Sequence, residues 1–186
     1  MISLMHLWLP ILLSAVGVFI ASSILHMVLK FWHTPDYQSF SNEDEVRAAI
    51  RKGNPGPGLY MLPSCKMEDM KKPETQEKFK QGPVGLVTLR ANGMMNMGPT
   101  LLQWFIFCLA VSYFCAYVGA ITLASGTDAM HVLQLTGTAA IMVYALGLVP
   151  NAIWGGQPWK VVIKAIIDGI IYGLITGAIF ACLWPK

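Results

Sequence analysis

The chain has 186 residues, of which 55% are hydrophobic and 12% are charged, and its formal net charge is +3. A mean hydropathy of +0.54 is too high for a soluble domain and indicates several membrane spans. Basic and acidic residues are mixed in one central segment, which excludes the continuous basic surface typical of a nucleic-acid-binding protein.

Four segments are apolar over the ~20 residues that a helix needs to cross ~30 Å of hydrocarbon. They are residues 7–32, 101–124, 131–153 and 161–184, and tryptophans lie near their ends, as at a membrane interface. The sequence therefore predicts an all-α transmembrane protein, a four-helix membrane bundle with a small α+β extramembrane cap between helices 1 and 2. The expected domains are helix 1 (1–32), the cap (33–98) and helices 2–4 (99–186).

The polar segment after the first span has helix and strand signals of its own. "SNEDEVRAAIRKG" predicts a helix that Asn42 caps, with Glu45 three residues later and Gly53 as its stop. "KPETQEKFKQG" predicts a second short helix, and "PVGLVTLRANG" predicts a strand. The cap is too small to bury much core alone, so we expect it to pack on the membrane face of the bundle or on a partner.

The positions of the lysine and arginine residues predict how the chain is oriented across the membrane. Apart from Lys186, they lie in or beside the first and third loops, whereas the second loop, "SGTDAMH", has only Asp128 as a charged residue other than histidine. The positive-inside rule then places the cap in the cytoplasm and both termini outside, although a loop as long as the first obeys this rule less strictly than a short one.

The last span carries small residues at intervals of four, a pattern that lets helix backbones approach closely in lipid. The pattern leaves open whether the partner is another span of this chain or a second copy. The residues are Ala165, Gly169, Gly173, Gly177 and Ala181.

Asp168 stands in the middle of the same apolar segment. An ionisable side chain near a bilayer centre costs at least ~2.5–3.5 kcal/mol on insertion scales, so it needs a partner or a function. Lys164 and Tyr172 lie one turn away on the same face, and we expect them to be its nearest partners. Asp168 is then either a structural anchor of the bundle or a group that titrates in binding or transport.

Polar residues of other spans are expected at the same depth and on the loop side. Together they predict a polar cluster, and a ligand or ion site, between the helices and beneath the cap. The candidate residues are Asp168, Lys164, Tyr172, His26, Lys30, Asn151 and Tyr144.

Soft metal ligands are also present, since thiolates and thioethers suit Cu(I). The candidates are Cys65, Met67, Met70, His26 and His33, but their spacing fits no defined metal template, and methionine commonly fills irregular gaps. No catalytic motif is present, so the sequence favours a role other than catalysis and assigns no cofactor.

The segment that follows the first span, "HMVLKFWHTPDYQSFSNEDEVRAAI", resembles a family of uncharacterised small bacterial integral membrane proteins with four spans. The resemblance covers most of the chain and implies a multi-pass protein of the bacterial inner membrane. It brings no known activity, and it assigns no residue roles.

Three functions compete. The first is a structural or accessory subunit of a homo- or hetero-oligomeric membrane assembly, whose partners are membrane lipid and other copies or another membrane protein. The second is a small proton- or cation-linked transporter or channel with its polar site around Asp168, and lesser alternatives are a Cu(I)-handling protein and an enzyme that acts on a lipid or quinone. A transporter should show a wet pocket at Asp168, whereas a scaffold should show this residue sealed and paired.

Overall fold

The computed structural model describes residues 2–186, which form two compact units. One unit comprises the chain up to Tyr37 together with Asn96–Lys186, and the other is Gln38–Met95. Four helices of the first unit are long and apolar enough to cross a membrane, namely Leu4–Val28, Met97–Thr122, Ala129–Ile153 and Trp159–Leu183. The expectation of a mostly helical chain with four helices long and apolar enough to span a membrane is therefore confirmed.

These segments are built from the following elements. The first span consists of η1 (Leu4–Leu7), α1 (Trp8–Ser23) and the π-helical turn η2 (Ile24–Val28), and it is followed by α2 (Lys30–His33) and η3 (Thr34–Asp36). The others are α5 (Met97–Thr122), α6 (Ala129–Tyr144) with η5 (Leu146–Leu148) and α7 (Val149–Ile153), and α8 (Trp159–Leu183).

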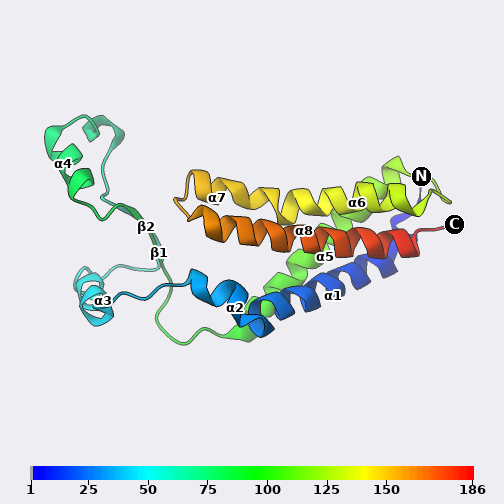
Figure 1. Cartoon of the computed structure of the whole chain (residues 1–186), viewed down its shortest axis with the longest axis horizontal. Helices are drawn as coiled ribbons and strands as arrows, with labels where there is room; N and C mark the ends of the chain where they lie inside the picture. The colour runs from blue at the N-terminus through cyan, green and yellow to red at the C-terminus, as the bar shows by residue number, and fades with distance from the viewer. Residues whose placement is uncertain (1) are drawn as a thin grey trace. The chain divides into compact units, whose positions relative to one another are not determined.

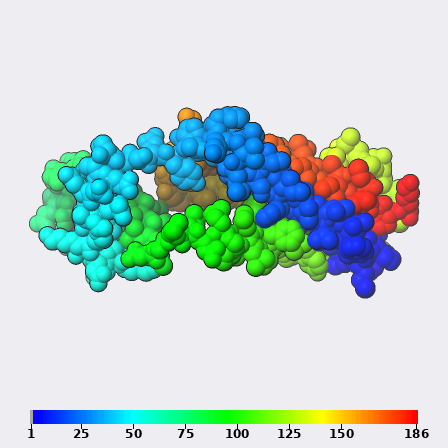
Figure 2. Space-filling view, turned by 90° about the horizontal axis from the view of Figure 1, so that it is seen from below, coloured from blue at the N-terminus to red at the C-terminus, as the bar shows by residue number. Residues whose placement is uncertain are grey.

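The helices of the bundle are arranged as two neighbouring pairs. Helices α6 and α8 run side by side along their length (Figure 1), and α1 contacts both α5 and α8. Figure 2 shows α1, in blue, with α5, in green, beside it. The backbone N–H of Ile2 bonds to Ala120 at 3.3 Å, and that of Gly126 bonds to Pro185 at 2.9 Å. Both chain ends therefore lie at the same end of the bundle as the α5–α6 connection.

Three glycines of α8 allow its close approach to α6. A Cβ atom added to Gly169 would lie 2.5 Å from the carbonyl oxygen of Tyr144, and one added to Gly177 would lie 2.9 Å from that of Leu133. A Cβ atom on Gly173 would overlap the side chain of Ile141. Both helices belong to this chain, so the close approach occurs within the bundle. Ala165 and Ala181 are half-buried further along α8.

The second unit contains α3 (Glu43–Lys52), β1 (Gly58–Leu62), η4 (Met67–Asp69), α4 (Pro73–Gln81) and β2 (Gly85–Leu89). The two strands pair antiparallel with Tyr60 opposite Val87. Helix α3 begins directly after Asn42 and ends before Gly53, as the sequence predicts. The Asn42 amide donates to the Glu45 carboxylate at 3.1 Å, whereas its side chain caps no backbone N–H group.

Candidate functional site

The first span does not continue as a helix to Trp32, which corrects the expected boundary. It widens into the π-helical turn Ile24–Val28, and Leu29 then leaves helical geometry with φ −83° and ψ 64°. The short helix α2 continues in a new direction. The segment contains no glycine or proline before Pro35, so local sequence does not cause the break. The residues after the break contact α8, where Trp32 and His33 bond to Asp168 and the Trp32 carbonyl accepts from Lys164.

The break brings two histidines together. His26 and His33 stack with ring centroids 4.2 Å apart and planes inclined by 7°. In an unbroken helix, seven residues would separate them by ~10.5 Å along the axis. The π-helical turn and the break therefore determine this arrangement, and π-helical turns are frequently found at functional sites.

Asp168 of α8 is the acceptor at the centre of the site. Its side chain is only 2% exposed. The indole N–H of Trp32 donates to Oδ1 at 2.8 Å, and Nε2 of His33 lies 2.6 Å from Oδ2. Nε2 of His26 approaches the same Oδ2 to 3.8 Å. The carboxylate thus binds α2, the short helix that follows the first span, to α8.

Asp36 and Lys164 add two more charged side chains to this cluster. Nδ1 of His33 lies 3.3 Å from Oδ2 of Asp36, and Lys164 Nζ donates to Oδ1 of Asp36 and to the carbonyl oxygen of Trp32, both at 2.6 Å. Lys164 Nζ also lies 5.4 Å from the centre of the Trp32 ring. The result is an alternating series of Lys164, Asp36, His33 and Asp168.

The two ring nitrogens of His33 both face carboxylate oxygens. A neutral imidazole has one N–H and can donate to only one of them. Both contacts are hydrogen bonds when one additional proton is held between His33 and the two aspartates. With that proton and the Lys164 ammonium, the two carboxylates are balanced in charge, which reduces the cost of burying them.

Asp36 lies outside the membrane-spanning segments. Its pKa is lowered from the ordinary range, chiefly because Lys164 donates a hydrogen bond to it, while burial acts in the opposite direction and the hydrogen bond from His33 lowers the pKa further. The carboxylate is therefore ionised at neutral pH and holds both Lys164 and His33 in place.

The structure places the expected site residues differently in several respects. The sequence predicts that Lys164 pairs with Asp168. The structure corrects this, because the Lys164 ammonium binds Asp36 instead. Tyr172, the other expected partner, is buried, but its hydroxyl, like that of Tyr144, has no hydrogen-bond partner within residues 2–186. The two rings pack edge to face at 5.6 Å. Lys30 and Asn151 are exposed.

Sequence reasoning missed Trp32 and Asp36 and did not name His33 as a hydrogen-bond partner of Asp168. Trp32 was assigned to the membrane interface by its position alone. The sequence signal that could have found Asp36 is the polar "HTPD" motif directly after the first span, in which Pro35 ends the helix and a carboxylate follows it.

The soft-ligand candidates divide between the two units. Cys65, Met67 and Met70 belong to the unit Gln38–Met95, whereas His26 and His33 belong to the bundle. Three possible metal-ligating atoms, from His26, His33 and Asp168, all lie within 4.8 Å of one another. This group combines nitrogen and oxygen donors, which do not favour Cu(I).

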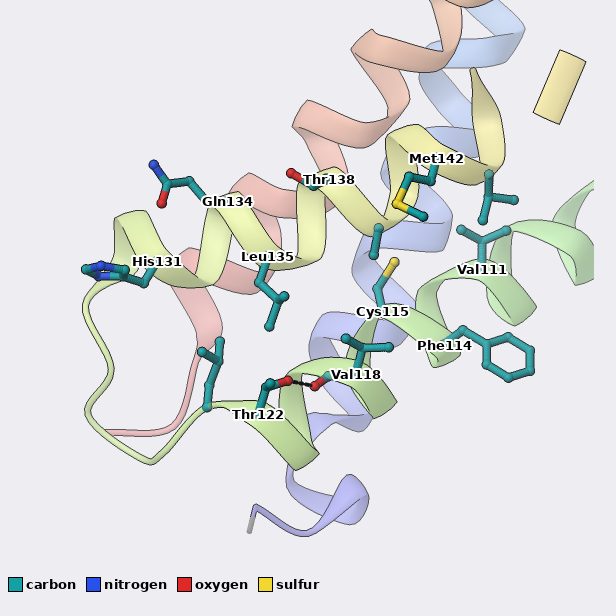
Figure 3. Close-up of a pocket in the computed structure, with 13 residues that line it drawn as sticks. Val111, Phe114, Cys115, Val118, Thr122, His131, Gln134, Leu135, Thr138 and Met142 are labelled. Atoms are coloured by element: carbon teal, nitrogen blue, oxygen red, sulfur yellow. Dashed lines mark hydrogen bonds between the residues drawn. The ribbon is translucent and has the colours of Figure 1, made fainter. Parts of the chain in front are cut away.

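A second feature of the bundle is a groove of about 690 Å³ between α5 and α6. Figure 3 shows Leu135 of α6 pointing towards α5, with Cys115 and Val118 of α5 facing the same space. The groove reaches from Val111 to Leu123 along α5 and from His131 to Val143 along α6. The bundle leaves this largely apolar surface uncovered.

No protein-family model, curated protein or solved structure matches the chain. The functional argument therefore depends on the residues and their geometry.

Proposed function

We propose that this protein is an integral membrane protein that serves as a structural or accessory subunit of a larger membrane assembly, with Asp168 as the anchor of its bundle. The observation that carries the proposal is that Asp168 is buried and hydrogen-bonded. Its carboxylate is 2% exposed and bonded to Trp32 and His33 of α2, the short helix after the first span. A group that loads and releases a transported ion needs access to water, whereas a sealed and paired carboxylate serves to hold helices together.

The interior beyond Asp168 supports the same proposal. Tyr172, Thr176 and Phe180 follow Asp168 towards the other end of α8, and all three are buried. Val18 of α1 and Val132 of α6 are fully buried as well. Side chains therefore occupy the space that a pathway through the bundle would need. Four helices are also few for alternating access, because transporter folds made of repeats use more spans.

The groove between α5 and α6 provides a surface for a partner. Its extent along α5, from Val111 to Leu123, corresponds to ~18 Å of helix. In a bilayer, acyl chains or the helix of another membrane protein must cover it. A partner helix would gain the close packing that drives association in lipid, and we propose this as the occupant.

The assembly proposal is tested by filling the groove. The Leu135→Trp variant places a large side chain where Leu135 faces α5, and the Leu174→Trp variant is the control, because Leu174 is 51% exposed on α8. The mass of the particle extracted from membranes with its surrounding lipid is measured for both. We expect a particle larger than one chain for the parent and for the control, and a smaller one for Leu135→Trp. A single-chain particle for the parent would contradict the proposal.

The transport alternative is tested separately. The protein is reconstituted in liposomes that contain a pH-sensitive dye, and a proton or potassium gradient is imposed. We expect flux no greater than in empty liposomes. Flux that the parent supports and Asp168→Asn abolishes, with both variants equally well assembled, would establish the transporter instead.

A further inference from the structure

We propose that His26, His33 and Asp168 form a binding site for a borderline divalent transition-metal ion such as Zn²⁺. The inference goes beyond the assembly role and does not depend on it. Two imidazole nitrogens and one carboxylate oxygen are a ligand set that Zn²⁺ accepts, and three protein ligands leave a fourth coordination position free.

The ligand atoms already converge. His33 Nε2 lies 2.6 Å and His26 Nε2 3.8 Å from Asp168 Oδ2, and all three atoms lie within 4.8 Å of one another. Two ligand atoms bound to one tetrahedral zinc at ~2.0–2.1 Å are ~3.3–3.4 Å apart. The observed separations lie on both sides of this value. Small movements of side chains therefore suffice to bring the three atoms around one ion.

The residues around the ligands have the arrangement that metal sites require. The histidine of such a site usually donates its second N–H to a carboxylate, which fixes the tautomer and orients the ring. Nδ1 of His33 faces Asp36 at 3.3 Å, and Lys164 holds Asp36 from its other oxygen at 2.6 Å. Trp32 occupies Oδ1 of Asp168 and leaves Oδ2 for the ion. Each of these contacts orients a ligand, and none uses a ligating atom.

Charge is also compatible with a cation. With the additional proton on His33, two carboxylates and one ammonium, the cluster is neutral before the ion binds, and its protein groups have a net charge of −1 once the ion has displaced that proton and left His33 neutral. Binding of the ion displaces the proton between His33 Nε2 and Asp168 Oδ2, which passes to water, so the ion takes the position of a hydrogen bond. The site thereby keeps α2 attached to α8 in both states.

His26 is the most exposed of the three proposed ligands. Its side chain is 51% exposed, in contrast to 13% for His33. It also lines a groove of about 300 Å³ between α1 and α5, together with Ser22, Met27, Met97 and Thr100. His26 is therefore the ligand that an incoming ion meets first, and the ion reaches Oδ2 of Asp168 only by displacing its contact with His33.

The test uses the purified full-length chain in detergent, depleted of metal with a chelator, and Zn²⁺ alone as the probe. Isothermal titration calorimetry gives the stoichiometry and affinity, and Co²⁺ in place of Zn²⁺ gives visible absorption bands that report four-coordinate geometry. We expect one ion per chain. His26→Ala should weaken binding at least ~10-fold, in line with the effect of altering even the surrounding residues of a metal site.

Two further variants make the result specific. His131→Ala is the matched control, because His131 and Asp128 form an exposed pair at 3.5 Å in α6 and its cap, and binding should not change. Asp168→Asn should abolish binding while the chain stays folded, since the asparagine amide can bond to both Trp32 and a neutral His33. Near-equal affinity of the parent and His26→Ala, or loss of binding in His131→Ala, would overturn the metal site. Neither outcome bears on the particle mass that tests the assembly role.

Discussion

Nε2 of His33 lies 2.6 Å from Oδ2 of Asp168, a contact between residues 135 positions apart in the chain. It joins the segment after the break in the first span to the middle of the last span. The carboxylate would otherwise be an unpaired charge in an apolar helix, and the histidine would continue away from the bundle. The contact therefore accounts both for the pairing of the buried Asp168 carboxylate and for the position of His33 beside α8.

Two substitutions of Asp168 should distinguish the effect of losing its hydrogen bonds from the effect of losing its negative charge. In Asp168→Asn, Oδ1 still accepts from Trp32 and the amide donates to Nε2 of a neutral His33, so we expect a loss of ~1 kcal/mol in the free energy of unfolding. In Asp168→Ala both bonds disappear, and we expect a loss of ~3–5 kcal/mol. Unfolding by sodium dodecyl sulfate in mixed micelles measures both. Equal losses would indicate that the hydrogen bonds do not matter.

Gly173 should not tolerate a side chain. In Gly173→Leu the new atoms would overlap Ile141 of α6 and force α6 and α8 apart, and the cost is expected to exceed the ~1–3 kcal/mol typical of an overpacked core. The control is Ala178→Leu, which adds a similar volume at an exposed position of the same helix. A variant of Gly173 as stable as that of Ala178 would contradict the close packing of α6 and α8.

Asp36 should make stability depend on acid pH. Lys164 lowers the pKa of Asp36 in the folded protein. The folded protein is therefore more stable, relative to the unfolded chain, when Asp36 is ionised than when it is protonated. Its contribution is fully present above the unfolded pKa of ~3.9 and is lost as the pH falls through the lower folded value. Melting curves of the parent and Asp36→Asn should therefore differ at pH 7, begin to converge at about pH 4 and coincide only below the lowered folded pKa. A difference that is constant with pH would exclude this role of the carboxylate.

The positive-inside rule predicts that the second unit lies in the cytoplasm. Single cysteines at Lys52 and at Ala129, introduced after replacement of the four native cysteines by serine, should react with an impermeant maleimide from opposite sides of the membrane. We expect Ala129→Cys to be labelled in intact cells and Lys52→Cys only after lysis. The reverse pattern would invert the orientation, and labelling of both in intact cells would contradict the topology.

Much of the fold could be predicted from the sequence because its signals are local. Continuous apolar segments gave the four spans, and acidic residues at the start with Gly53 at the end gave α3. The small residues of α8 indicated close packing, although the pattern could not identify α6 as the partner. Such a choice depends on how the helices assemble, and a one-helix pattern contains no information on it.

The site was predictable only in part. Asp168 was recognisable because a carboxylate in an apolar helix is costly, and His26 was placed at the same end of the bundle. Its true partners depend on the break at Leu29, which no glycine or proline marks. Helical spacing from Asp168 therefore selected Lys164 and Tyr172, whereas Trp32 and His33 reach the carboxylate only because the chain changes direction.

A double-mutant cycle between His33 and Asp168 tests the central claim most directly. The free energy of unfolding in mixed micelles is measured for the parent, His33→Ala, Asp168→Ala and the double variant, all without added metal. If the two side chains form the anchor of the bundle, the double variant should lose ~1–3 kcal/mol less than the sum of the single losses, as for residues in direct contact. Losses that add to within ~0.5 kcal/mol would mean that His33 and Asp168 do not interact, and would contradict the account.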